Sequence, residues 1–101
     1  MNIPSHLHFA LSTSLELRTG KYSNGRLAIQ ALDRDTGEHI ATLTVNIPDV
    51  HLAPDEVLIK DYAENLGALE TLVRAGILVH RSTVPCGHTT AALCVMLKEI
   101  V

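Results

Sequence analysis

HIATLTVNIPD, His39–Asp49, is the segment from which the predicted fold follows most directly, because apolar and polar side chains alternate along it from Ala41 to Ile47. Period two over this length is typical of a strand with one buried face. The solvent face is expected to carry Thr42, Thr44 and Asn46, and Pro48 to end the strand because proline cannot donate to the ladder. The core face is expected to carry Ala41, Leu43, Val45 and Ile47.

Two further strands are predicted upstream of this stretch. Apolar residues alternate from Leu7 to Leu17, with only Thr13 interrupting, and again from Leu27 to Leu32. The segments between them contain turn residues, among them Gly37, which supplies the positive φ of a tight hairpin. Three strands joined by short turns predict an antiparallel meander.

One helix is predicted downstream. Asp61 is its expected N-cap, with Glu64 as the capping-box partner. Gly76 is expected to end it in a Schellman turn closed by Ile77, and Gly67 inside it suggests a close approach to the sheet. The apolar stripe of this helix is expected to be Tyr62, Leu66, Leu69, Leu72 and Val73.

The C-terminal third completes the predicted fold. VLIK, residues 57–60, predicts a short extended piece, a loop follows the helix, and TTAALCVMLKEIV, residues 89–101, predicts a last strand. Both faces of that strand are apolar, which is typical of a central strand or one covered by a partner. The prediction is a single α+β domain over residues 1–101: an antiparallel sheet of four or five strands, the N-terminal meander plus the C-terminal strand, with one α-helix packed on one face. Such a sheet leaves a face and an edge that a homo-oligomer would cover.

Composition narrows the class of function. Of 101 residues, 47% are hydrophobic, and Phe9, Tyr22 and Tyr62 are the only aromatic ones, so an aliphatic core is expected. Few aromatics and no Lys/Arg cluster argue against a nucleic-acid partner. The N-terminus lacks the pattern of a signal peptide and no stretch approaches a membrane span, so we expect a cytoplasmic protein without a membrane partner.

Acidic residues are concentrated in the middle of the chain. Nine of the eleven lie between positions 33 and 70, against Arg34 and Lys60, while the net charge is only −3. One interpretation is that these acids fill turns and a solvated helix face. The alternative is a contact surface for the basic groove of a protein partner.

Both cysteines lie in HRSTVPCGHTTAALC, His80–Cys94. Strand parity assigns Cys94 to the core, which leaves His80, Cys86 and His88 as a weak metal set that matches no common zinc spacing. No orienting third group accompanies Cys86 and His88 as a catalytic pair. We therefore expect a Pro-Gly connector with a free thiol, no metal, no cofactor and no catalytic residue; a Cys/His-centred metal-binding or thiol enzyme is the alternative.

Three segments together resemble a known sequence pattern. IATLTVNIPD (40–49), KDYAENLGALETLVRAGIL (60–78) and VPCG (84–87) resemble TLTVNLP…KDYSENEGMLEALVEAGI…TVPSG, the pattern of a family of small uncharacterised proteins carried by bacteria, plasmids and phages. The resembling segments lie within residues 40–87, and the resemblance implies no activity. Leu66 stands where that pattern has Glu and Cys86 where it has Ser, so it implies no shared cysteine chemistry.

Polar residues gather at the predicted start of the helix. Capping of free N–H groups explains such residues without any partner. The functional interpretation is a recognition edge, composed of Asp55, Glu56, Lys60, Asp61, Tyr62, Glu64 and Asn65. On this interpretation the protein is a non-enzymatic accessory factor that acts by protein–protein binding, in the setting of the resemblance a phage or plasmid factor that inhibits a host defence system; a structural dimerisation module is a further alternative.

Overall fold

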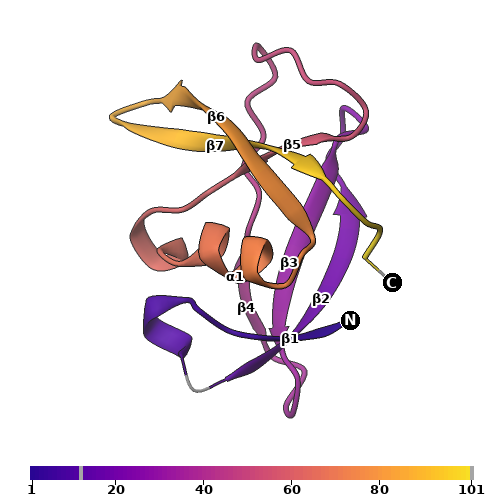
Figure 1. Ribbon diagram of the computed structural model, residues 1–101, viewed down its shortest axis with the longest axis vertical. Coiled ribbons are helices and arrows are strands. Elements are labelled where there is room, and N and C mark those ends of the chain that lie inside the picture. The colour runs from indigo at the N-terminus through magenta and orange to yellow at the C-terminus, as the bar shows by residue number, and fades with distance from the viewer. Residues whose placement is uncertain (12, 101) are drawn as a thin grey trace.

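The computed structural model describes residues 1–11 and 13–100, which form two antiparallel sheets around one helix (Figure 1). The α+β class predicted from the sequence is confirmed. The four-stranded sheet has the order β1-β2-β3-β4, and the three-stranded sheet has the order β5-β7-β6. The elements are β1 (Asn2–Pro4), the 3-10 turn η1 (His8–Ala10), β2 (Ser14–Lys21), β3 (Leu27–Asp33), β4 (His39–Thr42), β5 (Glu56–Ile59), the 3-10 turn η2 (Ala63–Asn65), α1 (Ala68–Arg74), β6 (Leu78–Cys86) and β7 (Thr89–Met96).

The prediction of a single sheet with a helix on one face is wrong, because the third predicted strand crosses from one sheet to the other. β4 ends at Thr42, and the chain then forms a bridge between Thr44 and Ile59 of β5. The Lys60 N–H donates to the Leu43 carbonyl at 2.8 Å, next to that bridge. One stretch of sequence therefore takes part in both sheets, and both sheets contribute to one core.

The crossing also explains why Thr44 is buried rather than solvent-facing. Its hydroxyl lies 2.9 Å from the Tyr22 hydroxyl and accepts the Ile29 N–H at 3.2 Å. A buried hydroxyl needs such partners, because an unpaired one costs about 1–3 kcal/mol. At the crossing, side chains on both faces of the stretch are buried, Leu43 on one and Thr44 on the other, while Val45 and Ile47 of the predicted core face are only half-buried.

The predicted long strand Leu7–Leu17 is wrong in its first half. Residues 8–10 form η1, Ser12 lies outside the described residues, and β2 begins at Ser14. The N-terminus folds back so that Ile3 of β1 pairs with Leu15, and the segment between them must turn. Phe9 is consequently 59% exposed although it follows the alternating pattern.

The predicted helix start is also wrong. Residues 63–65 form η2, and α1 begins only after Gly67, whose φ is +100°. A Cβ at Gly67 would lie 1.9 Å from the His6 carbonyl oxygen, so only glycine fits. The close approach predicted for Gly67 exists, but its neighbour is the N-terminal segment rather than a sheet.

The predicted helix end is confirmed in detail. The Ile77 N–H donates to the Leu72 carbonyl at 3.1 Å, and the Gly76 N–H donates to the Val73 carbonyl at 3.0 Å. Gly76 has a φ of +70°, and Ile77 is fully buried. These are the two hydrogen bonds and the apolar contact of a Schellman motif.

The segment expected to be a loop after the helix is strand β6. It pairs with β7 along residues 78–86, which makes β7 the central strand of its sheet, one of the two positions that its apolar faces predicted. The core of the molecule is aliphatic, as expected. Its largest fully buried apolar side chains are Leu7, Leu15, Leu17, Ile29, Leu43, Leu58, Ile59, Leu72, Ile77 and Leu78.

Candidate functional site

The predicted recognition residues lie at the two ends of β5. Asp55 and Glu56 lie where the strand begins, and the stretch Lys60–Asn65 follows where it ends. A four-residue strand spans about 13 Å, so the structure does not gather the seven residues into one surface. We refer to Lys60–Asn65 as the corner.

Asp61 caps α1 from a distance in sequence. Its Oδ1 accepts the Gly67 N–H at 3.1 Å and the Leu69 N–H at 3.0 Å. Both amides belong to the first turn of the helix, where free N–H groups need acceptors. The capping role predicted for Asp61 is therefore present, although the helix begins six residues later than predicted.

Asn65 fastens the corner to the four-stranded sheet. Its side chain is 1% exposed, and its Nδ2 donates to the Thr42 carbonyl at 2.6 Å. The Asn65 side chain and the Oδ1 of Asp61 therefore serve to hold the fold together.

The remaining corner residues form a small surface network. Glu64 is not a capping-box partner, since its carboxylate pairs with the Lys60 ammonium at 2.6 Å. That hydrogen bond holds the pKa of Glu64 below its ordinary value. Lys60 also lies 5.3 Å from the centre of the Tyr62 ring, within the range of a cation–π contact.

Tyr62 connects the corner to the β6–β7 hairpin. Its hydroxyl lies 3.5 Å from the Cys86 sulfur, and this hydrogen bond, followed by burial, raises the pKa of Tyr62 above its ordinary value. The contact between the neutral Tyr62 hydroxyl and the half-buried Cys86 thiol packs the corner against the end of β6. No described interaction links the Cys86 sulfur to His88, as a thiol enzyme would need.

The alternative metal set is not brought together. His80 is the third residue of β6 and Cys86 its last, a separation of about 20 Å in an extended strand. The predicted turn with a free thiol is confirmed, because Gly87 and His88 form the two-residue turn of the β6–β7 hairpin beside the free Cys86, but the residues before it form strand β6 rather than a loop. Within residues 1–11 and 13–100, no three His, Cys, Asp or Glu side chains are placed to hold a metal ion.

Cys94 is a core residue, as its strand parity predicted. It is fully buried on β7, and burial, with a smaller contribution from Asp61, raises the pKa of its thiol to about 12. A thiol with such a pKa stays protonated near neutral pH and is a poor nucleophile.

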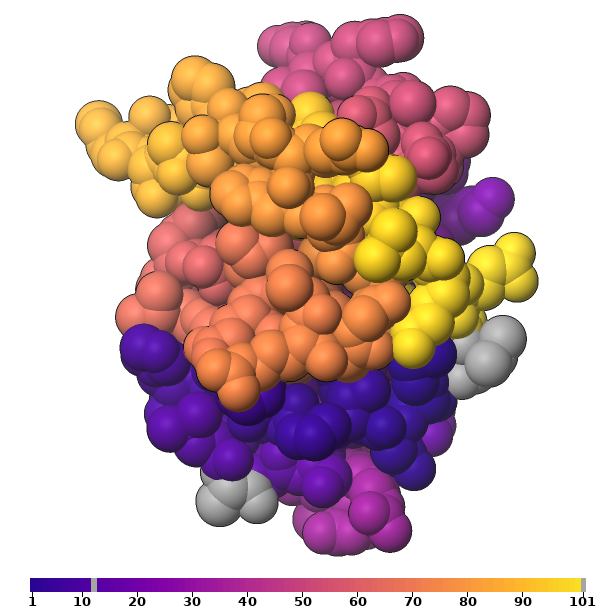
Figure 2. Space-filling model, in the orientation of Figure 1, coloured from indigo at the N-terminus to yellow at the C-terminus, as the bar shows by residue number. Residues whose placement is uncertain are grey.

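A groove lies at the other end of β5, with a volume of about 930 Å³. Three segments line it: residues 19–27 at the end of the β2–β3 hairpin, residues 52–56 before and at the start of β5, and residues 96–100 after β7. In Figure 2 the connector before β5 (residues 47–55), the tip of the β2–β3 hairpin and the C-terminal segment (residues 97–100) meet at the right-hand edge of the molecule. We refer to this hollow as the groove.

Asp55 and Glu56 both line the groove. The Asp55 carbonyl accepts the Met96 N–H at 2.8 Å, which fixes its backbone, while its exposed carboxylate has no partner among the described residues. Glu56 is half-buried, and its carboxylate accepts the Ala53 N–H at 2.6 Å. An unpaired carboxylate on a fixed backbone is available to a cationic group of a ligand.

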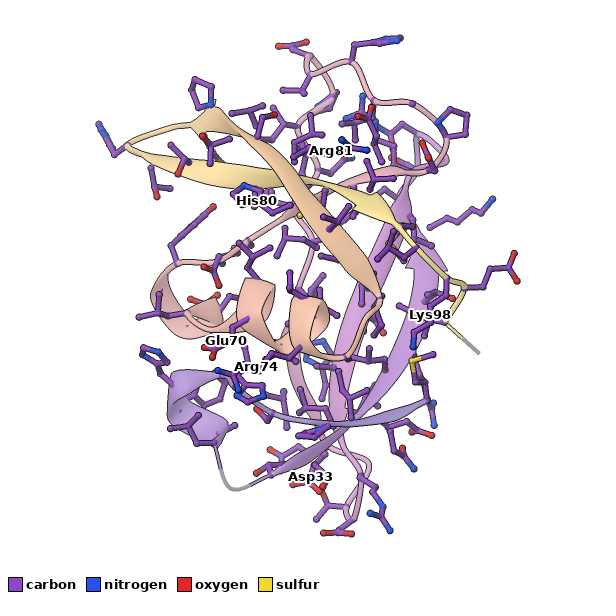
Figure 3. The ribbon with its side chains drawn as sticks, viewed as in Figure 1. Asp33, Glu70, Arg74, His80, Arg81 and Lys98 are labelled. Atoms are coloured by element: carbon purple, nitrogen blue, oxygen red, sulfur yellow. The ribbon has the colours of Figure 1, made fainter. Side chains whose placement is uncertain are left out.

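Arg26 lines the groove, and no sequence pattern singles it out. Its guanidinium donates to the Ile47 carbonyl at 2.7 Å and also to the Val50 carbonyl, so it holds the connector before β5 against the hairpin. Lys21 and Lys98 add two further cations, and Figure 3 shows Lys98 on the C-terminal segment. Residues from three distant segments meet here, and no local motif marks them.

No protein family, no curated protein and no solved structure matches this chain. Within the described part of the chain, no helix has the length and the apolar character that crossing a membrane requires.

Proposed function

We propose that this protein is a non-enzymatic binding protein, and that the groove is where it holds a protein partner. The observation that carries the proposal is the unpaired Asp55 carboxylate on the wall of a groove of about 930 Å³. Binding sites for ligands are concave surfaces of this order of volume, with apolar lining and a few placed polar groups.

The charges of the groove suit a polypeptide better than a uniformly charged ligand. The groove is lined by the acidic residues Asp55, Glu56 and Glu99, by the basic residues Lys21 and Lys98, and by apolar residues that include Leu52 and Leu97. Such an arrangement favours a partner with apolar and charged side chains of both signs, since complementary charges select the partner and its orientation. In the setting that the sequence resemblance implies, this partner would be a component of a host defence system.

The corner is the less suitable surface. Two of its five polar residues bond inward, and Lys60, Tyr62 and Glu64 already interact with one another. Of the predicted recognition residues, Asp55 is therefore the one proposed to meet the partner, while Glu56 beside it accepts the Ala53 N–H and helps to shape the groove.

The test is affinity capture from a lysate of the host cell with two charge-reversal variants. D55K/E56K changes the groove, while D35K/E38K makes the same change in net charge on the exposed β3–β4 turn. We expect D55K/E56K to lose captured protein by more than about tenfold and D35K/E38K to retain it, as quantitative mass spectrometry would measure. Equal capture by both variants would contradict the proposal.

A further inference from the structure

One long edge of β2 borders the groove. β1 pairs with β2 only along residues 14–16, and the Leu17 N–H donates to the Met1 carbonyl at 2.8 Å. β2 continues to Lys21, and its other edge pairs with β3 along the whole distance. Residues 18–21 of β2 therefore have a strand on one side only.

The backbone groups on this free edge can be assigned. In an antiparallel strand, the N–H and C=O of one residue point to the same side, and successive residues alternate. Leu17 bonds toward β1, so Thr19 and Lys21 also point to that side, beyond the end of β1. No described backbone hydrogen bond uses them, which leaves two N–H and two C=O groups unpaired.

These unpaired groups belong to the groove. Thr19 and Lys21 line it, and their side chains lie on the same face of β2 as the buried Leu15 and Leu17. The groove is thus an open continuation of the core, with apolar lining beside a free strand edge. Its apolar lining includes Leu27, Leu52, Met96, Leu97 and Ile100.

We infer that an extended segment of the protein partner adds to β2 as a strand in line with β1, an inference that rests on the proposed function. Its backbone bonds to Thr19 and Lys21, and an apolar side chain enters the groove. A lysine or arginine faces Asp55, and an acidic side chain faces Lys21, since neither charge has an ionic partner among the described residues. Strand addition of this kind gives affinity through main-chain bonds and specificity through alternate side chains.

Two alternatives are less suitable: filling of the free β2 edge by the C-terminal segment, and addition of the partner to the free edge of β6. The C-terminal segment leaves β7 on the side of β6, because the Leu97 N–H donates to the Ile77 carbonyl at 2.7 Å, and no described backbone hydrogen bond joins residues 97–100 to Thr19 or Lys21. The edge of β6 is also free, but it carries a bulge between His80 and Ser82, the charged Arg81 and Pro85. Bulges, charges and prolines are features that oppose strand addition at an edge.

The test uses short peptides selected from a random phage library on the immobilised full chain, with the tightest binder made synthetically. T19P removes the outward N–H without breaking a bond to β3, and T19V is the control that keeps it. We expect T19P to weaken the Kd about fivefold to tenfold, the equivalent of about one backbone hydrogen bond, and T19V less than about twofold.

A second measurement on the unmodified chain keeps the inference testable if T19P does not fold. At a peptide concentration of about 100 times the Kd, hydrogen exchange of the Thr19 and Lys21 amides should slow about a hundredfold. Unchanged exchange at both amides, a library without binders, or a dimer that protects them without peptide would overturn the inference. Loss of partner capture by D55K/E56K together with full binding by T19P would leave the groove as the site and reject strand addition alone.

Discussion

The two ends of β5 carry similar polar residues but use them differently. At the corner, Asp61 accepts two N–H groups of α1, and Asn65 donates to the backbone of β4. At the groove, the Asp55 carboxylate has no described partner although its backbone is fixed. Side chains that maintain the fold therefore differ from those available for binding in their exposure and hydrogen bonding, and not in how many charged residues surround them.

The largest expected effect comes from Gly67 at the base of the corner. Gly67→Ala should reduce the free energy of unfolding by about 3 kcal/mol or more, because its Cβ meets the His6 carbonyl in a left-handed conformation. Gly76→Ala is the matched control, since its φ is also positive but its nearest neighbour is the flexible Lys98 side chain at 3.8 Å. Gly76→Ala should lower the free energy of unfolding by about 1 kcal/mol, measured by urea denaturation. An equal loss for Gly67→Ala and Gly76→Ala would refute the close approach of His6 to Gly67.

The next effect compares the two ends directly. Asp61→Ala should lower the free energy of unfolding by about 1–2 kcal/mol, because two N–H groups of the first helical turn lose their acceptor. Asp55→Ala should change it by less than about 0.5 kcal/mol, since that carboxylate bonds to nothing described. Chemical denaturation measures both variants, and equal losses of unfolding free energy for Asp61→Ala and Asp55→Ala would contradict the different roles assigned to the two ends of β5.

The two cysteines should differ in reactivity with a thiol reagent. Cys86 is half-buried at the end of β6 and should react in the folded protein, while fully buried Cys94 should react only after unfolding. The folded pKa of Cys94, about 12, lies above its ordinary value of 9.0, so its contribution to stability is present below pH 9.0 and is lost as the pH rises toward 12.

Cys94→Ala tests that pH dependence. The stability difference between wild type and this variant should shrink as the pH rises above 9.0, because only the wild type has this thiol to ionise on unfolding. A constant difference across the alkaline range would show that the thiol pKa does not change on folding.

The smallest expected effect concerns the exposed Lys60–Glu64 pair. The folded pKa of Glu64 is below its ordinary value of 4.5, so its contribution is present above pH 4.5 and disappears as the pH falls through the folded pKa. Glu64→Gln should therefore show a small loss of stability at neutral pH and none in strong acid. A loss that persists in strong acid would point to a packing role instead.

Sequence patterns predicted the elements whose signals are local. The strand from Leu27, the short strand at β5, the β7 strand and the Schellman end at Gly76 all follow from alternation or cap chemistry within a few residues. β6 was missed because its central residues are exposed on both faces, so period two has no buried face to reveal.

The other differences arise from contacts that are distant in sequence. The helix start depends on the approach of His6 to Gly67, sixty-one positions later. The groove needs Arg26 to hold the connector and Met96 to bond Asp55, and no pattern in a single sequence marks those pairings. Charge alone could single out Asp55 and Glu56, but the groove that they line could not be predicted from the sequence.

The most direct test of the account is an amide chemical-shift map of the labelled full chain, recorded while the captured partner is added. We predict shifts at residues 19–27, 52–56 and 96–100, with the corner amides of residues 60–65 unchanged. Shifts confined to residues 60–65, with the groove amides unmoved, would contradict the division of roles between the two ends of β5.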